Sequence, residues 1–165
     1  MKVAPKPAVS SSLKPLVEVG KKVPDFSLPS SAGNTFKLSE YAGKTIVLYF
    51  YPKDDTPGCT LEGQEFTALK EEFAKKNCFV FGISKDNHAS HCKFIDKYGL
   101  KIELLSDEDE SVCKLFDVIK EKNNYGKKYL GIERSTFVID PQQNLRAEFR
   151  KVSAAGHAKQ ILDLV

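Results

Sequence analysis

The sequence has no C-x-x-C pair, no long apolar run and no strong excess of charge of one sign, and each absence excludes a class of protein. No apolar run approaches the roughly 20 residues that a membrane-spanning helix needs. The formal net charge is only +3, from 25 basic and 22 acidic side chains whose signs are interleaved. Neither nucleic acid nor a membrane surface is therefore expected as a partner.

The cysteines are few and widely spaced. They stand at Cys59, Cys78, Cys92 and Cys113 and form no dense framework, so a disulfide-stapled secreted domain is not expected. This usage favours a cytoplasmic protein with one or two redox-active thiols. Cys78 opens a predicted buried strand and Cys113 lies on the apolar side of a predicted short helix, so we expect both to pack as small hydrophobic residues.

The length of 165 residues suits one domain, and the 41% of hydrophobic residues can form a core. We expect a poorly ordered tail over residues 1–16 and a single domain over residues 17–165. The tail has three lysines, three prolines and no acidic residue, and it lacks the apolar centre of a signal peptide. A transit peptide is the alternative, although the tail contains no arginine and little amphipathic pattern.

Apolar periodicity predicts strands that alternate with helices. A hairpin is expected around a turn at 32–34, followed by a short helical turn that Ser39 would cap. The expected strands are 45–51, 78–84, 102–105, 135–140 and 145–150. The expected helices are 59–76, 87–98, a short one after 107 and 156–165, and a loop is expected at 121–128. This order predicts an α/β sandwich with a mixed sheet.

Cys59 follows the apolar strand 45–51 and the polar loop 53–58, at the predicted start of a helix. In that helix Leu61 is expected on the apolar face and Glu62 on another face. A helix N-terminus favours a thiolate and lowers the pKa of a free thiol from its usual value of about 8.5. Thr56 could direct its hydroxyl at the sulfur. The position favours a reactive thiol, and the alternative is that Cys59 only caps a turn.

The spacing Pro52-x-x-x-Thr56-x-x-Cys59 resembles the active-site motif of the peroxiredoxins. The longer string from Tyr51 to Thr60 resembles the peroxiredoxin Q branch, and the likeness runs from about Val19 to the end of the chain. The resemblance implies a thioredoxin-like fold with a mixed central sheet, flanking helices and an N-terminal hairpin extension. It also implies a thiol-dependent peroxidase that reduces hydrogen peroxide and organic hydroperoxides without a metal or other cofactor.

The resemblance assigns roles to particular residues. Cys59 would attack the peroxide and become a sulfenic acid, while the backbone N–H groups of Gly58 and Cys59 would bind the peroxide oxygens. The Thr56 hydroxyl would bond sulfur and peroxide, and Pro52 would shield the sulfur from water. Arg134 precedes the strand 135–140, as the second active-site arginine of the family does, and its fixed charge would stabilise the thiolate. Without the likeness, Arg134 would be read as a surface charge.

The thiol that resolves the sulfenic acid is less clearly marked. Many peroxiredoxin Q sequences carry it at the position of Gln64 here, so that route is absent. Others carry it in the next helix, where this chain has Ile95. Cys92 lies one helical turn earlier and is our expected resolving cysteine, although a disulfide with Cys59 would need local unfolding. The alternative is a one-Cys enzyme that an external thiol reduces directly.

The resemblance also suggests partners, and other readings remain open. Thioredoxin or a related dithiol protein would be the reductant, and the chain would act as a monomer. Glu62 could orient donors in the active-site loop. A thioredoxin-like disulfide oxidoreductase is disfavoured because C-x-x-C is missing, and a redox-sensing or chaperone-like module is disfavoured because Thr56 and Arg134 are present.

Two groups of potential metal ligands have simpler explanations. The acidic run 107–110 could hold a cation, but negative charge is also favourable at a helix start. His88 and His91 beside Cys92 could suggest zinc, but exposed helix histidines explain them and no fourth ligand is evident. No metal is therefore expected.

Overall fold

The computed structural model describes residues 17–165, and the tail expected over residues 1–16 lies outside them. A five-stranded mixed sheet has the order β5-β4-β3-β8-β9. Its central strand β3 (Thr45–Phe50) pairs in parallel with β4 (Cys78–Ser84) and antiparallel with β8 (Ser135–Ile139). The outer strands are β5 (Glu103–Ser106) and β9 (Leu145–Phe149). This arrangement is the mixed α/β fold that the sequence predicts.

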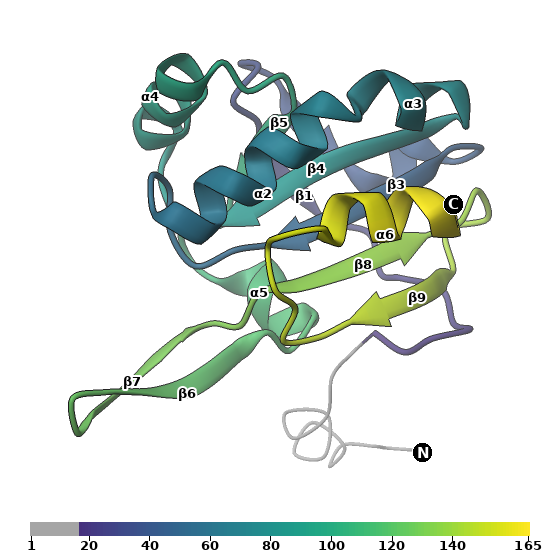
Figure 1. Ribbon diagram of the computed structural model, residues 1–165. Coiled ribbons are helices and arrows are strands. Elements are labelled where there is room, and N and C mark those ends of the chain that lie inside the picture. The colour runs from purple at the N-terminus through teal and green to yellow at the C-terminus, as the bar shows by residue number, and fades with distance from the viewer. Residues whose placement is uncertain (1–16) are drawn as a thin grey trace, which may run out of the picture.

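Both faces of the sheet are covered, so alternate residues of β3 enter different cores. Val47 and Tyr49 pack with helices α2 (Pro57–Ala68), α3 (Lys70–Lys75) and α6 (His157–Leu164), which lie on one face in Figure 1. Leu48 and Phe50 belong to the core on the other face, which also holds residues of α5 (Ser111–Leu115). Burial on both faces explains the continuous apolar run of this strand.

Smaller elements complete the chain. Strands β1 (Ser27–Pro29) and β2 (Thr35–Lys37) form the predicted hairpin, with Leu28 opposite Phe36. The 3-10 helix η1 (Leu38–Tyr41) follows directly. Helix α4 (His88–Tyr98) ends at the predicted residue and begins one residue later than predicted. Asn87 caps its first turn by accepting a hydrogen bond from the Ser90 N–H, and Gly99 ends it with φ +65°. No helix among residues 17–165 is long and apolar enough to cross a membrane.

The prediction of a loop at 121–128 is wrong. Strands β6 (Ile119–Asn124) and β7 (Lys127–Ile132) form an antiparallel hairpin that extends away from the sheet in Figure 1. Its turn residues Tyr125 and Gly126 both have positive φ, of 54° and 82°, as in a two-residue type I′ turn. Most of the arm is exposed on both sides, so the apolar alternation of an ordinary strand is missing.

Helix α2 also differs from its prediction. It begins at Pro57 rather than Cys59, because proline suits the first helical position, and it is interrupted at Leu69 before α3. The predicted faces are wrong at two positions, since Leu61 is 38% exposed and Glu62 is completely buried. The cap predicted at Ser39 is also wrong. Ser39 lies inside η1, where its N–H donates to Asp25.

Candidate active site

The site lies where β3 leads into α2. Cys59 is the third residue of α2 and is 2% exposed. The Arg134 Nη2 donates to its sulfur at 3.5 Å. Arg134 comes 75 positions later, immediately before β8, and Ser135 is paired with Phe50 at the carboxyl end of β3. The antiparallel β3–β8 pairing therefore places the guanidinium beside the first turn of α2, which carries the cysteine.

A buried carboxyl holds the arginine from the other side. Glu62 lies one helical turn after Cys59, so the two side chains share a face of α2. The Arg134 Nη1 donates to Glu62 Oε1 at 2.7 Å, while the buried Oε2 has no hydrogen-bond partner among the described residues. Burial raises the pKa of Glu62 to about 7 although the Arg134 charge opposes this shift. Burial also lowers the pKa of Arg134, but Glu62 and Cys59 outweigh it and leave that pKa raised.

The Arg134 cation therefore lies between Cys59 and Glu62, each of which can become an anion. A neutral Glu62 would leave the Arg134 charge to a Cys59 thiolate, and an ionised Glu62 would compete for it. Arg134 can approach the Cys59 sulfur because the neighbouring Gly58 has no side chain. A Cβ at Gly58 would lie 2.8 Å from Arg134 Nη2, so any side chain there would push the guanidinium away from the sulfur.

The loop between β3 and α2 carries the other expected residues. Thr56 is the residue before α2, and its carbonyl accepts the Thr60 N–H. Its hydroxyl donates to the Lys53 carbonyl at 2.8 Å instead of to the sulfur, and so closes the loop on itself. Pro52 is half-buried and lines a cavity of about 350 Å³ together with Arg134. Pro52 and Arg134 therefore border the same cavity, whereas the hydroxyl of Thr56 is directed away from the sulfur.

The β6–β7 arm contributes to this cavity, which sequence reasoning missed because it placed a loop there. The remaining lining residues are Lys120, Glu121, Lys122, Glu133, Lys151 and Val152. Burial, followed by the nearby Arg134 charge, lowers the pKa of Lys122. The cavity beside the arginine is therefore rich in positive charge.

Cys92 lies in α4 and is not bonded to Cys59, since all four cysteines are free. Its sulfur is 3.4 Å from His88 Nε2 and 3.9 Å from the Ser31 carbonyl in the β1–β2 turn. A disulfide between Cys92 and Cys59 would therefore need one of the two sulfurs to move. The other two thiols are buried, and burial raises the pKa of Cys78 to about 12 and that of Cys113 still further. Both pack in the core.

The prediction that His91 is an exposed helix residue is wrong. His91 is fully buried, and its Nδ1 is 2.7 Å from Asp54 Oδ2. Asp107, in the acidic run, accepts backbone N–H bonds from Val112 and Cys113 at the start of α5. Within residues 17–165, no group of three or more His, Cys, Asp or Glu residues is arranged to hold a metal ion.

Comparison with known proteins gives a consistent result. Residues 19–148 match the model of the AhpC/TSA family. Peroxiredoxin Bcp of Bacillus subtilis is 47% identical over 146 residues, covering 88% of this chain and 93% of that protein. A structure of the Xanthomonas campestris bacterioferritin comigratory protein, described for its alkyl peroxide reduction activity, is 46% identical. The likeness covers 89% of this chain and 96% of the Xanthomonas campestris chain, with a TM-score of 0.83. A structure of peroxiredoxin Q from Xylella fastidiosa is 41% identical with a TM-score of 0.85, covering 90% and 94%.

Proposed function

Because this chain belongs to the AhpC/TSA family and is a peroxiredoxin, a thiol-dependent peroxidase, we propose that Cys59 is the thiol that attacks the peroxide. The contact that supports this most directly is the one between Arg134 and the Cys59 sulfur. A nearby guanidinium stabilises a thiolate, and the thiolate is the nucleophilic form of cysteine. Neither Cys78 nor Cys113 has an arginine at hydrogen-bond distance among the described contacts.

The proposed reaction is an in-line displacement at oxygen. The Cys59 sulfur bonds to one peroxide oxygen, the O–O bond breaks, and the other oxygen leaves with the bonding electrons. That oxygen takes a proton to become water or an alcohol, and Cys59 becomes a sulfenic acid. Arg134 and the N–H groups of Gly58 and Cys59, in the first turn of α2, stabilise the negative charge on the leaving oxygen.

The loop residues have supporting roles in this proposal. Pro52 limits water at the sulfur, and Thr56 fixes the loop through its bond to the Lys53 carbonyl. When peroxide is bound, rotation of the Thr56 hydroxyl would let it bond the substrate and the sulfur instead. The substrates are hydrogen peroxide and organic hydroperoxides, and no cofactor takes part.

Resolution of the sulfenic acid is proposed to use Cys92. Its sulfur attacks the Cys59 sulfur, a disulfide forms, and the sulfenic oxygen leaves as water. A dithiol protein such as thioredoxin then reduces the disulfide by thiol–disulfide exchange. The partly exposed position of Cys92 in α4 supports this choice over the two buried cysteines. The alternative is direct reduction of Cys59 by an external thiol.

Three further assignments follow from the same proposal. Residues 17–165 act as one domain, and the chain works as a monomer. The four free thiols suit a reducing compartment such as the cytoplasm.

Steady-state peroxide consumption tests the proposal when it is coupled to thioredoxin and its reductase. The Cys59→Ser variant is expected to lose activity, whereas Cys78→Ala, a matched loss of a buried thiol, should retain it. Cys92→Ser should lose thioredoxin-dependent turnover but still consume one equivalent of peroxide. Full activity of Cys59→Ser would contradict the assignment of the attacking thiol.

A further inference from the structure

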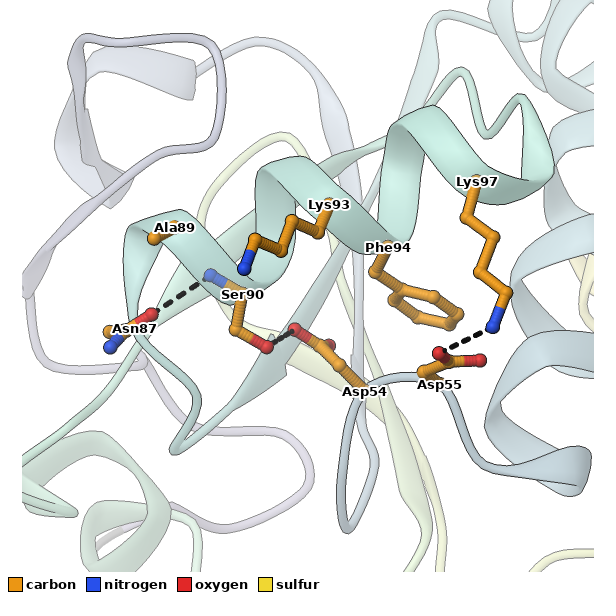
Figure 2. Close-up of a pocket in the computed structure, with 8 residues that line it drawn as sticks. All are labelled: Asp54, Asp55, Asn87, Ala89, Ser90, Lys93, Phe94 and Lys97. Atoms are coloured by element: carbon orange, nitrogen blue, oxygen red, sulfur yellow. Dashed lines mark hydrogen bonds and ion pairs between the residues drawn. The ribbon is translucent and has the colours of Figure 1, made fainter.

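A buried hydrogen-bonded cluster lies between the active-site loop and α4, apart from the Cys59 contacts. Its centre is His91, which is completely buried, and Asp54, which is 6% exposed. Asp54 belongs to the loop between β3 and α2, two residues before Thr56. Figure 2 shows Asp54 bonded to Ser90 and Asp55 bonded to Lys97 of α4. These four residues also line a cavity of about 490 Å³.

Hydrogen-bond geometry fixes how many protons this cluster holds. The His91 Nε2 is 3.1 Å from the Leu105 carbonyl oxygen, which can only accept, so Nε2 carries a proton. The other ring nitrogen, Nδ1, is 2.7 Å from Asp54 Oδ2, and a neutral ring with its proton on Nε2 would leave no hydrogen between Nδ1 and a carboxylate. The pair must therefore hold one additional proton.

The surroundings of Asp54 decide where that proton resides. The Tyr51 hydroxyl donates to Oδ1 at 2.6 Å, and the Ser90 hydroxyl donates to Oδ2 at 2.8 Å. Donors that converge on a carboxylate favour its ionised form. The additional proton therefore lies on His91, and the cluster is an imidazolium–carboxylate pair with its remaining polar atoms bonded.

This pair is the buried one of two connections between the loop and α4. The second is exposed. Asp55, whose φ is +58°, accepts from Lys97 Nζ at 2.9 Å and from the Tyr98 hydroxyl at 2.6 Å. Exposed ion pairs contribute little because water and salt screen them, whereas a buried pair is screened much less. His91–Asp54 is therefore the stronger of these two connections to α4, and the Asp54 N–H also donates to Asp86 Oδ2 at 2.8 Å.

We propose that protonated His91 is a positioning residue for the peroxidase site, because it anchors Asp54 and thereby the loop 51–56, which leads into α2 and Cys59. The effect on peroxide reaction rests on the proposed function, whereas the protonation of His91 does not. His91 touches no reacting atom. Its loss leaves Asp54 buried beside a smaller set of donors, and the loop moves to hydrate it, displacing the first turn of α2.

The protonation is tested on the unaltered protein by long-range proton–nitrogen NMR with ¹⁵N-labelled histidine at neutral pH. Both ring nitrogens of His91 are expected to carry protons, with its signals assigned as those that persist in His88→Gln and in His157→Gln. One bare ring nitrogen would overturn the proposal. This measurement needs no peroxide and no active enzyme, so it stands even if the assignment of Cys59 fails.

The positioning role is tested by two substitutions that keep different halves of the ring's bonding. In His91→Asn the amide nitrogen replaces Nδ1 and still donates to Asp54, whereas in His91→Gln it reaches toward Leu105 and leaves Asp54. The rate constant for oxidation of Cys59 by hydrogen peroxide is measured in a single turnover by mass spectrometry. We expect it to fall at least about tenfold in His91→Gln, since a displacement of about 1 Å can cost about 100-fold, and to recover substantially in His91→Asn.

His157→Gln is the matched control, because His157 is also buried but bonds Thr136 and Gln160. It should lose stability without a comparable loss of rate. Equal rates in His91→Gln and the wild type, or equal losses in all three variants, would overturn the positioning role. If wild-type Cys59 is not oxidised, the proposed function fails instead. If a His91 variant does not fold, the NMR result on the wild type still tests the protonation, and one bare ring nitrogen would still overturn the proposal.

Discussion

Replacing Glu62 with Gln is expected to change how the stability of the protein depends on pH. Glu62 is completely buried on α2, and burial raises its pKa from 4.5 to about 7 while Arg134 opposes the shift. A difference of this size between the unfolded and folded states corresponds to about 3 kcal/mol of unfolding free energy. Gln has nearly the same shape but no proton to release in this range.

The sign follows from which state holds the proton. Below about pH 4.5 the carboxyl is protonated in both states, so the contribution of Glu62 is fully present. As the pH rises toward about 7, the unfolded chain releases the proton and the folded protein keeps it, so the wild type becomes less stable. The unfolding free energy of Glu62→Gln minus that of wild type should therefore rise by about 3 kcal/mol across this window and then level off.

Urea unfolding under reducing conditions, repeated from about pH 4 to about pH 8, measures this difference. Glu65→Gln is the matched control, because Glu65 lies one turn further along α2, is half-buried, and accepts the Gly156 N–H through an oxygen that Gln also has. Subtracting its profile leaves the effect of burying Glu62. A difference that stays flat would refute the reasoning by showing that folding leaves the pKa of Glu62 unchanged, and one that falls as the pH rises would show that Arg134 lowers this pKa.

Three other substitutions test the site and the helix beside it. Arg134→Lys cannot contact Glu62 and Cys59 together through a planar fork, so kcat/KM for hydrogen peroxide should fall by about tenfold or more; an unchanged value would contradict the bridging role. Gly58→Ala should lower the same constant by about tenfold by displacing the guanidinium, with little change in the urea midpoint because the clash is with a flexible side-chain end; a normal rate would show that the close approach is unnecessary. Asn87→Ala removes the cap of α4 and should cost about 1 kcal/mol in urea unfolding, and no loss would argue against the cap.

The parts of the site that the sequence predicts are those with local signals. The strand before Pro52 is recognisable from its continuous apolar run, and the helix start from the proline, glycine and polar residues around Cys59. Arg134 is recognisable only because the motif around it resembles a family. Its place beside the sulfur depends on the pairing of β3 with β8, which local periodicity does not specify.

The features that the sequence missed depend on contacts between distant residues. A glutamate on a helix is normally taken as solvent-facing, and the burial of Glu62 is understandable only with Arg134, 72 positions later, beside it. The burial of His91 could not be predicted for the same reason, since its partner Asp54 is 37 positions away. The β6–β7 arm was missed because its strands bury little and so show no apolar alternation.

The measurement that tests the central claim most directly is peptide mapping by mass spectrometry after one equivalent of hydrogen peroxide, under non-reducing conditions, on wild type and Cys92→Ser. A Cys59–Cys92 disulfide in the wild type, replaced by a sulfenic acid or more oxidised Cys59 in the variant, is the predicted result. Sulfenic acid at Cys59 in both proteins would support Cys59 as the attacking thiol but would show that the enzyme is a one-Cys peroxidase. A Cys59 that remains a free thiol in both would contradict the claim that it reduces peroxide.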